Sequence, residues 1–260
     1  MPEGLYIAYA AVVGLIFGSF ATVAAHRIPK RESIVKGRSL CPSCGAKIGA
    51  RDNVPLLSYL LLRGHCRACG WRIPLRYPAI ELTTAALFAL CAWRFGLSLT
   101  AVVFAGFFWV LVVLTVIDLD HKLLPDRVVY PTFVAGWAGL IAAAMIDGAT
   151  ARLGAAAVGA GVFGGLFFLL AYIYPAGMGG GDVKLAFVLG TFLGYAGGLG
   201  AVLAGMFLSF LTGAVAGIVA MVGKDGNRKT QIPFGPFLAL GTAIAVFAGE
   251  PLARAYLDLL

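Results

Sequence analysis

The sequence predicts an all-α polytopic membrane protein of about eight transmembrane helices, with a small zinc-ribbon-like insertion between helices 1 and 2. Of the 260 residues, 60% are hydrophobic and only 12% are charged, a composition outside the range of ordinary soluble domains. The apolar residues fall in runs of roughly 20, which is the length that crosses a bilayer. A single sizeable polar segment, residues 26–77, contains four of the five cysteines.

Eight apolar runs account for the predicted spans. They lie at 6–25, 79–95, 99–118, 128–147, 153–175, 185–200, 201–222 and 234–257. No small-residue cleavage pattern follows the first run, so we interpret it as a span and not as a signal peptide. Only the glycines of 194–200 separate the sixth run from the seventh, and seven spans are the alternative. We therefore expect a first helix (1–25), a cytoplasmic zinc-binding domain (26–77) and a transmembrane domain of helices 2–8 (78–260).

Lysine and arginine predict the orientation. Segment 26–77 carries 11 of the 20 basic residues against two acids, and cytoplasmic loops collect such positive charge. Eight spans threaded from this segment place 17 basic residues on the cytoplasmic side and three opposite, with both termini on the periplasmic, outer side. The net charge of +8 then reports orientation and contact with anionic membrane lipid, and it requires no nucleic-acid partner.

Two cysteine pairs predict a metal site in this segment. Cys41 and Cys44 form "CPSCG", and Cys66 and Cys69 form "CRACG" after 21 intervening residues. Each tight turn directs two thiolates at one ion, and the second pair completes a tetrahedron around zinc. Two disulfides or four inert thiols are the alternative, which a reducing cytoplasm disfavours. Four thiolates leave no open coordination position, so we expect the zinc to be structural.

Acidic side chains at membrane depth are the candidates for chemistry, because their desolvation must be compensated. On the predicted topology five of them lie toward the cytoplasmic side: Glu81, Asp118, Asp120, Asp126 and Asp182. Two carboxylates in one pocket cannot both ionise easily, so one can activate water while the other protonates a carbonyl oxygen. The alternative is that these acids cap helices or pair with Lys122, Arg127 and Lys184.

The segment "GMGGGDVK" at 177–184 favours the catalytic interpretation. Irregular backbone at membrane depth is tolerated only where it is buried in protein or lines a wet cavity. The glycines from Gly177 to Gly181 could unwind the end of the helix and let an extended substrate approach. Asp182 would then lie over a peptide bond.

Several motifs occur together along most of the chain. They are "FGSFATVAAHRIP" (17–29), the two CxxC pairs, "RDNVPLLSYLLLRGHC" (51–66), "RYPAIE" (76–81), "DLDHKLLPD" (118–126), "GMGGGDVK" (177–184) and "IPFGPFLALG" (232–241). In this order they resemble the type IV prepilin peptidases, within the wider GxGD class of intramembrane aspartyl proteases.

The resemblance implies that Asp118 and Asp182 are the catalytic pair. Asp126 is the competitor for the first role, but it follows Pro125 and suits a helix cap, whereas Asp118 ends an apolar run. The supporting residues that it implies are Glu81, Asp126, Gly179, Gly181 and Lys184. Glu81 would orient the site or serve methyl transfer.

The resemblance also implies the reaction: an aspartic endopeptidase removes the basic leader of a prepilin or pseudopilin after a glycine, at the cytoplasmic face of the bacterial inner membrane. The new amino terminus is then methylated from S-adenosylmethionine. No strand followed by G-x-G-x-x-G is legible, so the binding site of the methyl donor stays unknown. The alternatives are a non-catalytic pilin-binding assembly protein and an ion- or proton-coupled transporter, which would leave the cysteine pairs unexplained.

Overall fold

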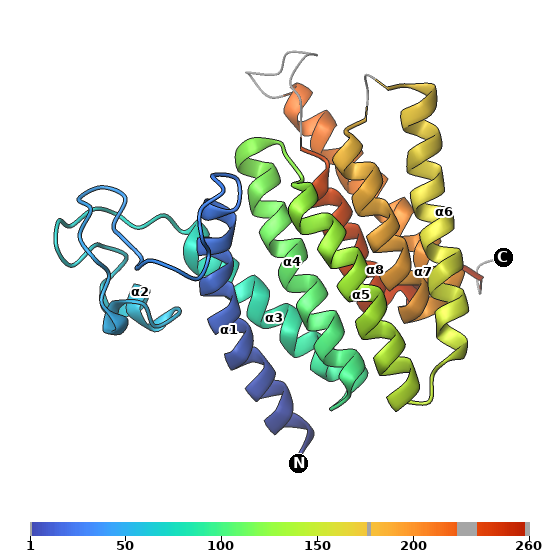
Figure 1. The fold of residues 1–260 in the computed structure, drawn as a ribbon, viewed down its shortest axis with the longest axis horizontal. Helices are drawn as coiled ribbons and strands as arrows, with labels where there is room; N and C mark the ends of the chain where they lie inside the picture. The colour runs from blue at the N-terminus through green and yellow to red at the C-terminus, as the bar shows by residue number, and fades with distance from the viewer. Residues whose placement is uncertain (1, 176–177, 223–232, 258–260) are drawn as a thin grey trace. The chain divides into compact units, whose positions relative to one another are not determined.

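The computed structural model describes residues 2–175, 178–222 and 233–257, and every regular element within these ranges is helical (Figure 1). The elements are α1 (Glu3–Arg27), η1 (Ala50–Asp52), α2 (Leu57–Leu61), α3 (Arg76–Phe95), α4 (Leu99–His121), α5 (Asp126–Ile146), α6 (Ala151–Ile173), α7 (Gly180–Val222) and α8 (Gly235–Leu257). The predicted all-α class is thereby confirmed for the described residues.

The chain divides into two compact units, which we call unit 1 (Met1–Leu97) and unit 2 (Ser98–Leu260). In unit 1, α1 packs along α3, and the segment between them holds η1 and α2. In unit 2, α7 packs along both α6 and α8, while α4 contacts α5 and α8. Our division at residues 25 and 77 follows the expected membrane boundaries and stays a prediction.

Five helices, α1, α4, α5, α6 and α7, have the length and apolar composition needed to cross a membrane. α3 and the described apolar part of α8 do not reach that standard, so the expected number of eight spans is matched only roughly. α7 has 43 residues and would be about 65 Å long if straight, roughly twice the thickness of a bilayer core. Its backbone is non-helical at Gly197 and Gly198, within the predicted turn at 194–200.

Aromatic side chains form the core of unit 2 between α4 and α7. The rings of Phe107 and Phe192 stack with centroids 3.9 Å apart, and the Phe104 ring meets Phe192 edge-on at 5.2 Å. All three side chains are buried.

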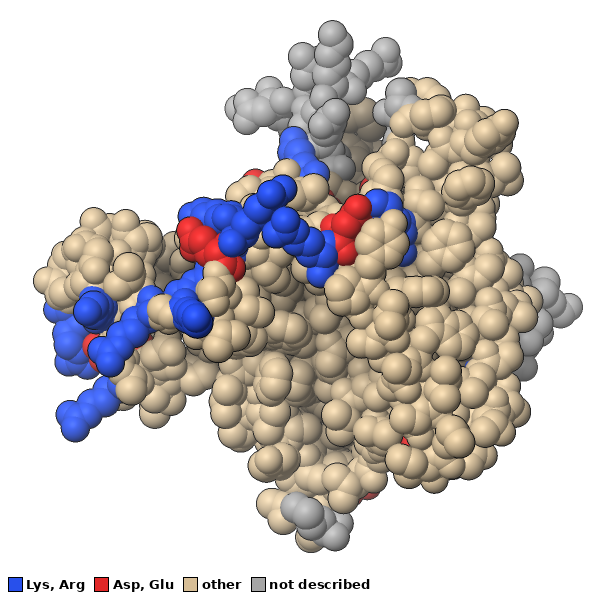
Figure 2. All heavy atoms as spheres, in the orientation of Figure 1, with Lys and Arg blue, Asp and Glu red and all other residues tan. Residues whose placement is uncertain are grey.

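Figure 2 shows that the face in view carries broad uncharged surface. Large apolar side chains are also exposed on unit 2, among them Val102, Val134, Phe168, Phe207 and Val219. Such an exposed apolar surface suits lipid better than water.

Glycine allows α6 and α7 to pack backbone against backbone. A Cβ atom placed on Gly159 of α6 would overlap the carbonyl oxygen of Gly190 in α7. Helices inside membranes often associate through such small residues, because there is no hydrophobic effect to drive them together. Van der Waals contact over this close approach therefore holds the two helices together.

This contact predicts different outcomes for two glycines of the same helix. We expect Gly159→Ala to lower the free energy of unfolding by about 1–3 kcal/mol, because the added methyl group overpacks the contact. Gly161→Ala is the matched control: a Cβ there has no neighbouring heavy atom within 4 Å, so alanine should be neutral or stabilise the helix by up to about 1 kcal/mol. Unfolding of both variants in detergent, followed by circular dichroism, measures this, and equal stabilities would contradict the close-packing argument.

Candidate functional site

The two CxxC pairs adopt the same tight turn. The backbone N–H of Cys41 donates to the carbonyl of Ala46 at 2.9 Å, and the N–H of Gly45 donates back to the Cys41 carbonyl at 2.9 Å. The turn at Cys66 repeats this pattern, with Gly70 in the place of Gly45. Both glycines have a φ of +70°, a left-handed conformation that glycine adopts without steric cost. The glycine that trails each pair therefore sets the direction of the two thiols.

The four sulfurs converge on one point. The thiols of Cys41, Cys44, Cys66 and Cys69 all lie within 4.8 Å of one another, and none is in a disulfide. The sulfurs of Cys41 and Cys69 are 4.0 Å apart. A tetrahedral zinc ion with bonds of about 2.3 Å would hold its sulfurs about 3.8 Å apart. The predicted cluster of four cysteines is therefore present, and its geometry fits a closed structural zinc site.

The pKa values of the clustered thiols also favour the binding of a cation. Backbone N–H groups of Cys44 and Ser43 lower the pKa of Cys41 to about 7. The N–H of Ala46 likewise lowers the pKa of Cys44, but the Cys69 thiol, desolvation and the Cys41 thiol outweigh it and raise that pKa to about 11. Crowded thiols cannot all ionise without a positive charge among them. A bound dication would supply that charge.

Asp118 lies at the end of α4 and is only 5% exposed. Its carboxylate Oδ2 accepts a hydrogen bond of 2.9 Å from the backbone N–H of Gly235, the first residue of α8. Its carbonyl oxygen accepts from the N–H of Lys122, which ends the helix in a left-handed conformation. An unsatisfied N–H at a helix start is a favourable partner for an anion. The start of α8 therefore holds the Asp118 side chain in place.

Asp182 lies in the first turn of α7 and is half-buried. The carboxyl groups of Asp118 and Asp182, 64 positions apart in the sequence, are close enough to interact electrostatically. Glycine makes room around them: a Cβ on Gly179 would come within 2.9 Å of the Asp182 Oδ2, and a Cβ on Gly181 within 2.9 Å of the Leu124 Cβ. The structure thus brings together the two aspartates that the sequence singled out.

The expected unwinding of "GMGGGDVK" is only partly right. Gly180 and Gly181 already lie in the first turn of α7, so the irregular backbone ends at Gly179. The remaining glycine, Gly177, lies outside the described residues. Asp182 therefore lies on regular helix and not on an unwound segment.

Asp126 pairs with a lysine instead of joining Asp118 and Asp182. The Lys184 Nζ lies 2.7 Å from the Asp126 Oδ1, and the two side chains are 35% and 55% exposed. The same ammonium group lies 5.3 Å from the centre of the Tyr130 ring. Such an exposed pair contributes about 0–1 kcal/mol. The pairing alternative therefore holds for Asp126, while Asp120, at the end of α4, is exposed.

Glu81 belongs to unit 1. It is 9% exposed, and its Oε2 accepts a hydrogen bond of 2.8 Å from the backbone N–H of Leu56. The hydroxyl of Ser19 on α1 is its second partner. Leu56 has a φ of +57°, which is uncommon for a residue other than glycine. The loop backbone is thus held in a strained conformation at the point where it contacts Glu81.

Gly235 and Leu124 were not identified from the sequence as parts of the site. Gly235 lies inside the motif "IPFGPFLALG", where a Gly-Pro pair at the start of an apolar run signals the beginning of a helix. Leu124 is buried, and it lies beside Gly181 and Gly235. Nothing in the local sequence shows that residue 235 donates to residue 118, since that contact forms only when α4 and α8 pack together.

Comparison with known proteins covers most of the chain. The model of the Bacterial Peptidase A24 N-terminal domain matches residues 12–95, and that of the Type IV leader peptidase family matches residues 105–219. Similar proteins named "Prepilin leader peptidase/N-methyltransferase" occur in Pseudomonas aeruginosa (37% identical, over 95% of this chain and 92% of the relative) and in Bacillus subtilis (35% identical, over 95% and 96%). No solved structure matches the chain.

The cysteine cluster predicts about one zinc ion per purified chain, measured by mass spectrometry of the metal. Replacing two ligands, Cys41→Ser with Cys44→Ser, should abolish zinc binding and make segment 28–75 sensitive to protease, because metal binding and folding are coupled in such sites. Cys91→Ala is the control, since Cys91 is buried in α3 away from the cluster and its loss should leave the zinc content unchanged. A wild-type chain that is folded without metal would show the assignment to be wrong.

Proposed function

The chain belongs to the type IV leader peptidase family, and on that premise we propose that it cleaves prepilins or pseudopilins with Asp118 and Asp182 and methylates the new amino terminus. The observation that carries the proposal is the pairing of Asp118, buried and hydrogen-bonded to the start of α8, with Asp182 in the first turn of α7. Peptide hydrolysis needs one group that accepts a proton and one that donates it.

The hydrogen bond from the start of α8 supports a different role for each aspartate. Asp118 accepts from the N–H at the start of α8, which favours its ionised form, so it takes a proton from water. The water oxygen attacks the carbonyl carbon of the scissile bond while Asp182, in its protonated form, gives a proton to the carbonyl oxygen. The carbon–nitrogen bond then breaks: the leaving nitrogen receives the proton held by Asp118, and a hydroxyl group of the diol returns a proton to Asp182. Two carboxyl groups that share one proton are suited to this exchange.

The residues around the pair support this geometry. Gly179 and Gly181 allow the backbone at the start of α7 to approach a substrate, because a side chain on either would contact Asp182 or Leu124. The ion pair of Asp126 with Lys184 ties the start of α5 to the start of α7. We assign these residues to positioning, and the structural zinc to holding the segment between α1 and α3.

For the membrane arrangement we propose eight spans, counting the two halves of α7, with both termini on the outer side. Cleavage after a glycine of the substrate then occurs at the cytoplasmic face of the inner membrane. The asymmetric distribution of lysine and arginine supports this orientation, although Lys224, Arg228 and Lys229 of that count lie outside the described residues. The apolar surface of unit 2 would contact lipid, and no nucleic-acid partner is needed.

S-adenosylmethionine would supply the methyl group, as the name of the relatives implies. When bound, it presents a methyl group on a positively charged sulfur to the amine of the processed substrate. Asp118 and Asp182 lie in the part of the chain that matches the leader peptidase model. Unit 1, which matches the other model, is therefore the part left to serve the methyl transfer.

The proposal predicts that Asp118→Asn and Asp182→Asn each lower the rate of leader removal by about 10²–10⁴-fold, because each removes one proton-transfer group. Trimming of a synthetic prepilin by purified chain in detergent, followed by mass spectrometry, measures the rate. Asp147→Asn is the matched control: Asp147 accepts a hydrogen bond of 2.6 Å from Thr100, in the first turn of α4, whereas Asp118 lies in the last turn. Full activity of either aspartate variant would refute the catalytic pair, and an inactive wild type would favour the assembly or transporter alternatives.

Gly235→Ala tests the hydrogen bond from α8. The new Cβ would lie 2.7 Å from the Asp118 Oδ2 and 3.3 Å from the Leu124 Cδ2, so the carboxylate must move. We expect kcat to fall about 10–10²-fold with a smaller change in KM. Displacement of a catalytic group reduces the stabilisation of the transition state more than it reduces the binding of the substrate. Gly217→Ala in α7, where a Cβ meets no heavy atom within 4 Å, should leave both constants unchanged. A Gly235→Ala enzyme with normal kcat would show that this contact does not position Asp118.

A further inference from the structure

Unit 1 contains a large cavity that the peptidase chemistry does not use. Its volume is about 1070 Å³, at the upper end of the roughly 300–1,000 Å³ usual for small-molecule sites. Its walls come from the second half of α1, from the segment between α1 and α3, and from the first turns of α3. All of these elements belong to one compact unit, so the cavity is a property of that unit alone.

Glu81 is the buried acid in the wall of this cavity. Its partners are neutral donors, the N–H of Leu56 and the hydroxyl of Ser19, and among the described residues no cationic side chain pairs with it. Buried carboxylates are usually paired with a positive charge. Because Glu81 also lines an open space, a ligand can bring that charge.

Aromatic rings line the same cavity. Tyr59 and Trp71 both contribute to its wall, and both side chains are half-buried. Aromatic faces stack with planar heterocycles such as nucleobases and attract cations through their π electrons. The ligand that these rings suit is therefore partly aromatic and positively charged.

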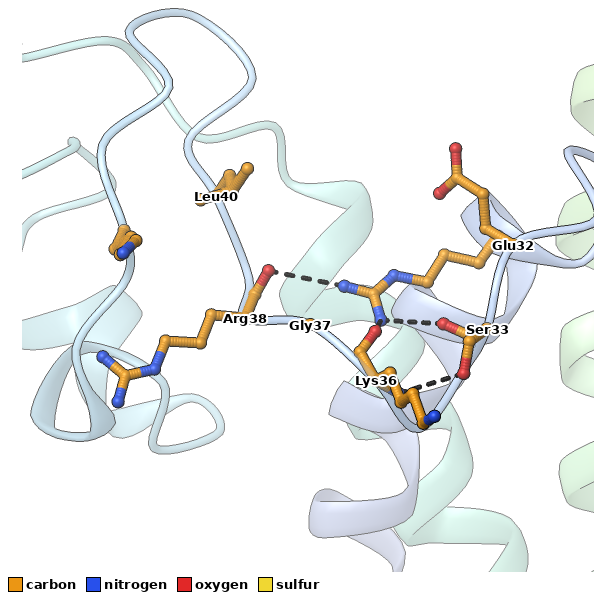
Figure 3. Close-up of a pocket in the computed structure, with 8 residues that line it drawn as sticks. Glu32, Ser33, Lys36, Gly37, Arg38 and Leu40 are labelled. Atoms are coloured by element: carbon orange, nitrogen blue, oxygen red, sulfur yellow. Dashed lines mark hydrogen bonds between the residues drawn. The ribbon is translucent and has the colours of Figure 1, made fainter.

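Basic side chains line one part of the cavity, where they outnumber the single acid Glu32. A smaller pocket of about 680 Å³ adjoins it and shares Arg38 and Lys47 with its wall. Figure 3 shows this pocket and the hydrogen bonds that shape it. The Arg27 guanidinium donates to the carbonyls of Ser33 and Lys36 at 3.0 and 2.8 Å and so holds the loop that forms its rim. Arg38 and Lys47 supply positive charge that would attract a carboxylate.

We propose that this cavity binds the methyl donor, S-adenosylmethionine, and that Glu81 recognises its sulfonium cation. The inference rests on the proposed function, because it places one of the two substrates of the methyl transfer. The donor combines the features that the cavity accommodates: an adenine ring, a cationic sulfur and an amino-acid carboxylate. Glu81 is a positioning residue in this proposal.

The charge of the sulfur also allows Glu81 to distinguish the methyl donor from the product. In the transfer the amine nitrogen forms a bond to the methyl carbon and loses a proton, while the electron pair of the broken carbon–sulfur bond stays on the sulfur. The product, S-adenosylhomocysteine, therefore has no charge on its sulfur. A buried carboxylate attracts the donor more strongly than this product, so Glu81 favours binding of the donor and release of the product.

Equilibrium dialysis of the full-length, zinc-loaded chain in lipid nanodiscs, with radiolabelled S-adenosylmethionine or S-adenosylhomocysteine, tests this proposal. We expect the wild type to prefer the donor, and Glu81→Gln to reduce the ratio of the two affinities by about tenfold or more. Glu3→Gln removes a carboxylate from the exposed start of α1, away from the cavity, and should leave the ratio unchanged. If Glu81 has only a structural role, Glu81→Gln will reduce the affinities for both ligands equally. That result would overturn the proposal.

Val23→Phe gives an independent test, because Val23 is a half-buried residue of α1 that lines the cavity. The larger ring should reduce the affinity for both ligands about tenfold or more while the zinc content stays normal. Unchanged binding would overturn the proposal even if Glu81→Gln does not fold.

Leader removal is measured in the same preparations. A wild type that does not cleave a prepilin refutes the proposed function, whereas a wild type that cleaves but binds the donor independently of Glu81 and Val23 refutes only this inference.

Discussion

Every backbone N–H and C=O group that enters a bilayer must find its partner within the protein, and the described parts of this chain follow that constraint closely. Long helices satisfy it along their length, and in the described part of unit 2 irregular backbone is confined to helix ends and to the break at Gly197 and Gly198. The first N–H groups of a helix have no hydrogen-bond partner within that helix. The start of α8 gives one such N–H to the Asp118 carboxylate, so the same constraint that makes the fold helical creates a place for a buried acid.

The two units solve the problem of a buried carboxylate in similar ways. Asp118 accepts from a backbone N–H at the start of a helix, and Glu81 accepts from a backbone N–H in a strained loop. Neutral donors stabilise a carboxylate without neutralising it. Each acid therefore keeps its capacity to act on something else, which in our proposals is a water molecule for Asp118 and a cationic ligand for Glu81. This shared arrangement makes a bifunctional enzyme physically reasonable.

The segment between α1 and α3 has little else than its four-cysteine cluster to stabilise it. It has only two short helical pieces, and apolar side chains such as Val35 and Leu61 remain exposed on it, so it has little hydrophobic core of its own. Small segments of this kind usually rely on a disulfide or a metal for stability. The four sulfurs bring two turns together that lie far apart in the sequence. Both turns also form walls of the cavity next to Glu81, so a zinc ion held by the four sulfurs would stabilise that wall.

The sequence alone determined whatever depends on local pattern. Runs of apolar residues predicted the helices, paired CxxC turns predicted the four-cysteine cluster, and motif order predicted the family together with the importance of Asp118 and Asp182. The number of spans was matched only roughly: α3 lacks the apolar composition of a span, and the described apolar part of α8, Gly235–Gly249, is shorter than one. Tertiary structure alone decided which acid is buried: Asp118 receives the N–H of Gly235, whereas Asp126 faces Lys184. That choice depends on how α4, α7 and α8 pack, and packing between residues far apart in the chain leaves no local signal in the sequence.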